Sequence, residues 1–76
     1  MKNYVNQKLT LKMAKQKAKN YANALQTPYC IFVYNEKAGD FKGHHLVEPE
    51  YIRQLFDKNK ELDFVEKVEV GIKIHS

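Results

Sequence analysis

A chain of 76 residues with a formal net charge of +4 has room for one domain, predicted here as residues 1–76, whose apolar core outweighs chain entropy by a small margin. Hydrophobic residues make up 43% of the composition and only three glycines and two prolines occur, which excludes a disordered or collagen-like chain. A single cysteine excludes an intrachain disulfide, so we expect a reducing, cytoplasmic compartment.

The first predicted element is an amphipathic helix from Thr10 to Gln26, in which apolar residues recur at helical spacing. Thr10 suits the N-cap, and Pro28 excludes helical geometry at Thr27. The helix lies in a segment with a marked charge imbalance, since the first 35 residues contain six lysines and no acidic residue. Its predicted inner face consists of Leu11, Ala14, Ala18, Tyr21, Ala22 and Leu25.

Two strands are predicted next. The segment 29–35 is rich in aromatic and β-branched residues and reads as a central strand buried on both faces. Its apolar run of six residues is far shorter than the ~20 that cross a membrane, so no membrane partner is expected. Residues 36–40 contain Gly39 and are predicted to form the turn of a hairpin whose second strand is 41–47.

A short helix and a last strand complete the predicted order. Pro49 suits the first helical position, and the inner face is predicted to hold Ile52, Leu55 and Phe56. From Phe64 onward apolar and polar residues alternate, which is typical of a strand with one buried and one solvent-exposed face. Its predicted apolar side consists of Val68, Val70, Ile72 and Ile74.

These elements predict an α+β fold of order α-β-β-α-β, a two-layer open-faced sandwich with a three-stranded mixed sheet. We expect both helices on one face of the sheet and, from a right-handed crossover, the spatial strand order 2-1-3. Residues 1–8 are predicted to form a loose arm.

The candidate binding residues begin with a lysine row, which comprises Lys8, Lys12, Lys15 and Lys19 at helical spacing. A phosphate or an acidic surface would relieve the mutual repulsion of these lysines, and the alternative is a solvated face that keeps the protein soluble. Arginine is absent from the row, so base-specific readout of nucleic acid is not expected.

Aromatic residues and strand edges supply the other candidate contacts. Tyr34 and Phe41 flank the predicted hairpin turn, where we expect them to be exposed and to contact a partner. An open sheet edge, particularly that of the second strand, is a further route to a partner or to a homodimer.

Catalytic or metal chemistry has one weak candidate. With a four-residue turn, Cys30 would face His45 across the hairpin, and such a pair could hold a metal or activate a thiol. No third ligand is evident, and a lone cysteine in a strand is more often a small buried hydrophobe. We therefore predict no catalytic residues, no metal and no cofactor.

The sequence thus favours a non-enzymatic binding protein, of the kind that serves as an accessory or regulatory factor of a phage, plasmid or other mobile element. We expect it to engage another protein with an acidic surface, through the lysine row and the hairpin or a sheet edge. The alternative is sequence-independent binding of DNA or RNA through the same lysines.

Overall fold

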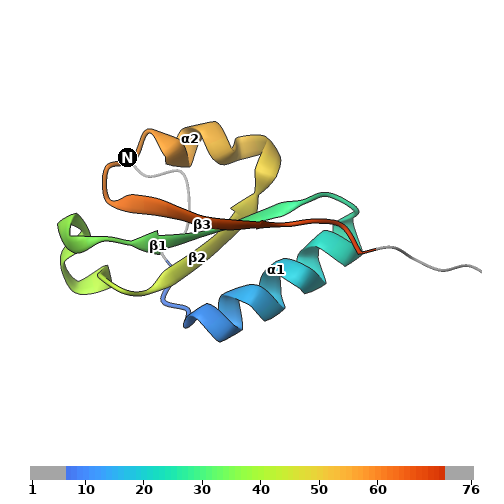
Figure 1. Cartoon of the computed structure of the whole chain (residues 1–76), viewed down its shortest axis with the longest axis horizontal. Helices are drawn as coiled ribbons and strands as arrows, with labels where there is room; N and C mark the ends of the chain where they lie inside the picture. Colours follow the sequence, from blue (N-terminus) through green and yellow to red (C-terminus); the bar gives the residue numbers. More distant parts are fainter. Residues whose placement is uncertain (1–6, 72–76) are drawn as a thin grey trace, which may run out of the picture.

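The computed structural model describes residues 7–71 and confirms the predicted order of helices and strands (Figure 1). Two short 3-10 segments, η1 and η2, accompany them. The elements are α1 Leu11–Leu25, β1 Tyr29–Tyr34, η1 Glu36–Phe41, β2 His45–Pro49, η2 Glu50–Ile52, α2 Arg53–Asp57 and β3 Leu62–Val68. No helix in this part of the chain has the length and hydropathy needed to span a membrane.

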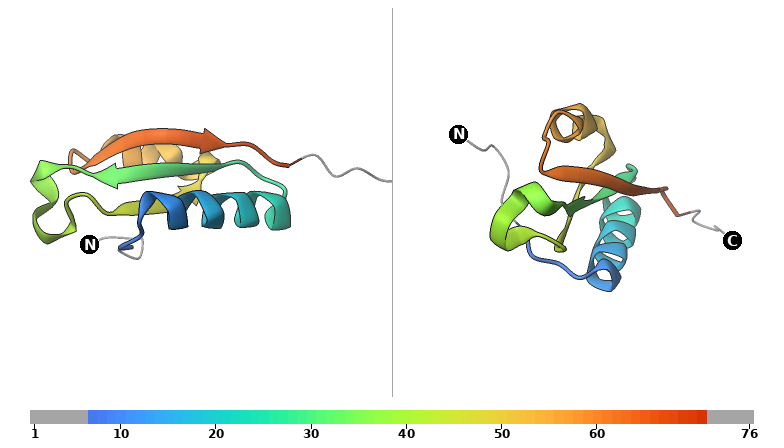
Figure 2. Two further views of the ribbon diagram at one scale, coloured as in Figure 1. Left: turned by 60° about the horizontal axis from the view of Figure 1, so that its bottom comes forward. Right: turned by 60° about the vertical axis from the view of Figure 1, so that its left-hand side comes forward.

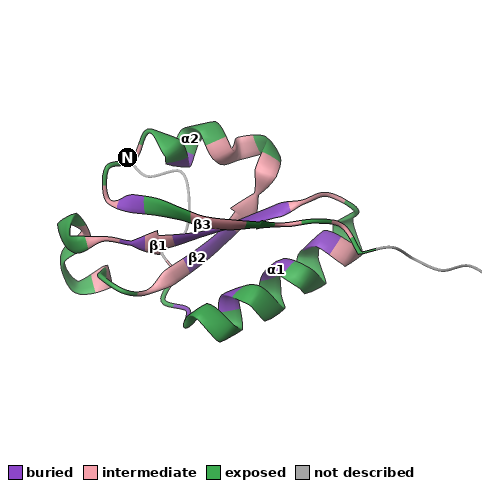
Figure 3. Cartoon of the chain, viewed as in Figure 1, coloured by how far each residue is buried: buried purple, intermediate pink, exposed green. Residues whose placement is uncertain are grey.

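Helix α1 begins and ends as its sequence predicts. The Thr10 side chain accepts a hydrogen bond from the Met13 N–H (3.1 Å), which caps the first turn. At the other end Gln26 adopts a left-handed conformation with φ 54°, and the chain turns toward β1. The buried stripe is narrower than predicted, because it contains Ala14, Ala18 and Ala22, whereas Leu11, Tyr21 and Leu25 are exposed (Figure 3).

The sheet has the order β2-β1-β3, as predicted, but it is antiparallel throughout, so the prediction of a mixed sheet is wrong. The reason lies in the connection through α2, which returns the chain to the end of the sheet where β2 began. Strand β3 therefore runs in the direction of β2. Since β1 lies between them and runs the opposite way, both hydrogen-bonded pairs are antiparallel.

The two helices cover opposite faces of the sheet, so the predicted two-layer sandwich with both helices on one face is also wrong (Figures 1 and 2). Alternate residues of β1 point to opposite sides. Ile31 packs with the alanine stripe of α1, whereas Phe32 packs with Phe56 of α2. A central strand buried on both faces needs a cover on each, and one helix supplies each cover.

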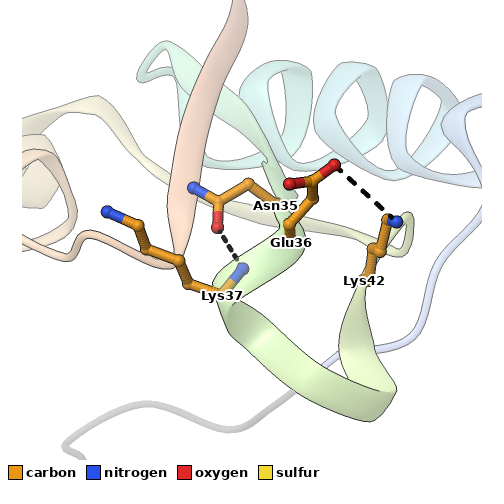
Figure 4. A network of polar contacts seen from close by, with 4 residues as sticks. All are labelled: Asn35, Glu36, Lys37 and Lys42. Carbon is orange, nitrogen blue, oxygen red and sulfur yellow. Dashed lines mark hydrogen bonds and ion pairs between the residues drawn. The ribbon is translucent and has the colours of Figure 1, made fainter.

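The connection from β1 to β2 is longer than predicted. Asn35 caps η1 by accepting the Lys37 N–H (2.9 Å), and the chain bends at Gly39, where φ is 62° (Figure 4). An exposed ion pair between Lys42 and Glu36 (4.0 Å) lies across the same connection. Because these turns occupy residues 36–41, β2 begins at residue 45 rather than 41.

The outer edge of β2 is closed by the segment that precedes α1. Leu9 forms an antiparallel bridge with His45, with N···O distances of 3.1 and 2.7 Å. The Gln7 side chain acts as a further peptide group, since its Nε2 donates to the Val47 carbonyl and its Oε1 accepts the Val47 N–H, both at 3.2 Å. The expectation of an open second-strand edge is therefore wrong. Of the predicted arm, residues 1–6 lie outside the described chain, and Gln7 is bonded to this edge.

Strand β3 is shifted toward the N-terminus relative to its prediction, since it spans 62–68. A bulge opposite Ile31 and Phe32 places Val65 and Glu66 on the same side, facing α1. The predicted alternation is interrupted there. Of its apolar side, Val68 and Val70 lie within the described chain, and Ile72 and Ile74 lie outside it.

Candidate binding surface

Three members of the predicted lysine row form one flank of α1. We call Lys12, Lys15 and Lys19 the α1 ridge, and all three are exposed. Helical spacing places them together, beside the buried alanines rather than opposite them. Lys8 is not part of the ridge, because the helix begins at Leu11 and the chain before it is extended.

The α1 ridge lies on the side of the helix that faces β3. The Lys15 ammonium is 3.7 Å from the Glu66 carboxylate of β3. Nearer the C-terminal end of the helix, the Asn23 Oδ1 accepts a hydrogen bond from the Gly71 N–H (2.7 Å). Gly71 follows the end of β3. Both links join the same flank of α1 to β3 or to the residues that follow it.

Most of the charge on the ridge is not neutralised by the protein itself. The Lys15–Glu66 pair is solvent-exposed, with side chains that are 54% and 42% accessible, so it contributes little to stability. Among the described residues no carboxylate lies within ion-pair distance of Lys12 or Lys19. The ridge therefore presents a net positive surface to solvent.

The remaining predicted contact residues, Lys8, Tyr34 and Phe41, lie together at the C-terminal end of β1. The Lys8 ammonium lies 4.9 Å from the centre of the Phe41 ring, and the Phe41 and Tyr34 rings are 5.1 Å apart. Phe41 is partly buried, whereas Tyr34 is only 2% exposed. The expected exposure of Tyr34 is wrong, because its side chain belongs to the core on the α2 side of the sheet.

The Cys30–His45 pairing predicted across the hairpin does not form. Cys30 lies opposite Glu48, and His45 lies opposite Val33, because the connection is longer than four residues. The two side chains point to opposite faces of the sheet. Nδ1 of His45 is buried without a hydrogen-bond partner in the structure. Within residues 7–71 no group of three or more His, Cys, Asp or Glu side chains is arranged to hold a metal ion.

Cys30 is expected to be inert in the folded protein. Burial raises the pKa of its thiol, which disfavours the nucleophilic thiolate. We predict that iodoacetamide alkylates Cys30 at least about a hundredfold more slowly in the native protein than in denaturant. Mass spectrometry of timed samples measures both rates. A native rate close to that in denaturant would contradict the buried position and restore the thiol as a candidate nucleophile.

Several exposed apolar side chains were not predicted as surface residues. Leu11 lies beside the ridge on α1, and Met13 and Tyr21 lie on the other flank of the helix. Leu25, at the C-terminal end of α1, is 60% exposed. The sequence carries a signal for these residues, because a stripe of three alanines is too narrow to bury every apolar residue of the helix. A helical wheel that marks only apolar positions does not show that the alanines are buried and the larger apolar residues exposed.

Comparison with known proteins finds no matching family model, no similar curated protein and no similar solved structure.

Proposed function

We propose that this chain is a non-enzymatic binding protein that engages an acidic surface of another protein through the α1 ridge. The observation that carries the proposal is the unneutralised charge of the ridge on a helix without any acidic residue. Its lysines repel one another, and carboxylates from a partner would relieve that repulsion.

An exposed apolar residue beside the ridge favours a protein over a nucleic acid. Leu11, which lies next to Lys15 on this flank of the helix, is 39% exposed. A phosphate backbone offers such side chains nothing to pack against, whereas a protein surface does. The sheet faces cannot serve as a platform for stacked bases, because α1 covers one and α2 covers the other.

The proposal is tested with two triple variants that carry the same net charge. The ridge variant has Lys12→Gln, Lys15→Gln and Lys19→Gln, and the matched variant has the same change at three exposed lysines elsewhere, Lys37, Lys58 and Lys60. We expect the ridge variant to lose about tenfold in affinity for a partner isolated from the native host, and the matched variant to keep it. Equal losses in titration calorimetry would show that only total charge matters.

Sequence-independent binding of DNA or RNA is the alternative for the same lysines. If it holds, a mobility-shift assay with duplex DNA retains the wild-type protein at low salt. The logarithm of the affinity then falls by ~0.9 for each phosphate neutralised as the logarithm of salt concentration rises. Our proposal predicts no retention of duplex or single strands at low salt. If the wild-type protein and the matched variant retain duplex DNA and the ridge variant does not, nucleic-acid binding is favoured over our proposal.

A further inference from the structure

The two outer edges of the sheet differ. The edge of β2 is closed by Leu9 and by the Gln7 side chain. Within residues 7–71 no strand pairs with the outer edge of β3. An unpaired edge is a template for an added strand.

The register shows which peptide groups of β3 face outward. The Tyr34 N–H of β1 donates to the His44 carbonyl (2.9 Å), toward β2, and peptide groups along a strand alternate in direction. Phe32 and Cys30, which lie two and four residues before Tyr34, therefore also direct theirs toward β2. Their partners in β3, Phe64 and Lys67, consequently direct their own peptide groups away from β1, toward the open edge.

On the α1 side the open edge lies beneath positive charge. The Lys15–Glu66 ion pair and the Asn23–Gly71 hydrogen bond show that α1 and β3 run alongside each other in the same direction (Figure 1). Lys19 lies on the same flank, between these two links. The acidic residues of β3 on this face are Glu66, which Lys15 already pairs, and Asp63, which lies at the other end of the strand from Lys19.

On the α2 side the same edge carries an aromatic surface. The Phe64 ring is 40% exposed, and the Arg53 guanidinium lies 3.8 Å from its centre. Arg53 is itself paired with Asp57 (3.3 Å), so its charge is partly satisfied. A residue added beside Phe64 would therefore meet an apolar surface backed by a planar cation.

We propose that an extended segment of the partner protein adds to the outer edge of β3 as a fourth strand, with acidic side chains toward the α1 ridge and apolar side chains toward Phe64. Alternate side chains of a strand point to opposite faces, so one segment with alternating acidic and apolar residues meets both surfaces. This inference rests on the proposed function and specifies how the acidic partner binds.

A second copy of the chain does not fit this edge. Antiparallel pairing of two β3 strands about a two-fold axis places both α1 helices on the same side of the joined sheet. The two ridges would then meet, which brings six ammonium groups together.

The probe for this inference is a short synthetic peptide of alternating glutamate and valine, titrated into the isotopically labelled chain. We expect the amide resonances of Phe64 and Lys67 to shift and their hydrogen exchange to slow. The same peptide with a fully N-methylated backbone keeps its charges and loses its donors, so it should bind about tenfold more weakly or worse. An alternating lysine and valine peptide should not bind.

A variant of the protein gives an independent test. Lys67→Pro removes one outward N–H without removing a bond between β1 and β3, and Lys67→Ala is its matched control. We expect the proline variant alone to bind the glutamate peptide several-fold more weakly. Far-ultraviolet circular dichroism checks that both variants fold.

The outcomes separate the edge from the ridge. If the glutamate peptide shifts only α1 resonances and N-methylation has no effect, strand addition is wrong and the ridge proposal stands. If no peptide binds at millimolar concentration, or if the chain alone dimerises with protected β3 amides, strand addition is wrong as well. If, in addition, the ridge and matched variants behave alike toward the partner, the proposed function fails too.

Discussion

Replacing Phe32 by alanine is expected to cost about 4 kcal/mol of unfolding free energy and to leave much of the chain unfolded at 37 °C. Phe32 is 1% exposed at the centre of the middle strand, where its ring lies 5.6 Å from that of Phe56 and 5.9 Å from that of Phe64. The truncation leaves a cavity between the sheet and α2. Because a domain of 76 residues is stable by only about 4–11 kcal/mol, one such loss removes a large share of its stability.

Phe64→Ala is the matched control for Phe32→Ala. The two phenylalanines lie opposite each other in β1 and β3 and face the same side of the sheet, but Phe64 is partly exposed. We expect it to cost roughly 1 kcal/mol. Urea titrations followed by circular dichroism measure both changes. Equal costs would show that β3 is as deeply buried as β1 and would contradict the open edge.

Replacing Ala18 by leucine is expected to destabilise the chain by about 3 kcal/mol, because the added carbons have no space between α1 and the sheet. Ala18 is fully buried at the middle of the alanine stripe, beside Ile31 and Val47. For a domain of this size the loss corresponds to a decrease of roughly 12–24 °C in the melting temperature. Differential scanning calorimetry gives the measurement.

The same substitution at Ala24 tests whether position rather than residue type is responsible. Ala24 lies on the exposed side of α1, and leucine is nearly as good a helix former as alanine. We expect Ala24→Leu to change stability by less than about 0.5 kcal/mol. A loss as large as that of Ala18→Leu would mean that α1 does not rest on the sheet through its alanines.

Local signals predicted much of the fold. Thr10 and Pro28 set the bounds of α1 within a residue or two, since caps and prolines act on their immediate neighbours. The apolar run that follows predicted a central strand buried on both faces, which β1 is. Burial on both faces requires a cover on each face, whereas the predicted two-layer fold leaves one face of the central strand uncovered.

Other features depend on pairing between distant residues and left no local pattern. The start of β2 depends on the turns around Gly39, and the bulge at Val65 depends on how β3 meets β1. Closure of the β2 edge depends on Gln7, whose side chain bonds a residue 40 positions away. The flank of α1 that faces β3 was equally hidden, so the lysine row was predicted without its position beside a sheet edge.

The exposure of single residues was the least predictable property of the candidate surface. Tyr34 and Phe41 both flank the predicted turn, yet Tyr34 belongs to the core and Phe41 is partly exposed beside Lys8. Their difference arises from the inward direction of Tyr34 on the α2 side of β1. Lys8 does not lie in line with the other lysines of the predicted row, because the helix does not extend before its N-cap, Thr10.

Lysine acetylation footprinting of the wild-type chain, alone and bound to its partner, tests the central claim most directly. Mass spectrometry reports the modification rate at each lysine without any substitution. Our account predicts that the partner slows acetylation of Lys12, Lys15 and Lys19 and leaves Lys37, Lys58 and Lys60 unchanged. Protection of the second group, or no change at the α1 ridge in the complex, would contradict it.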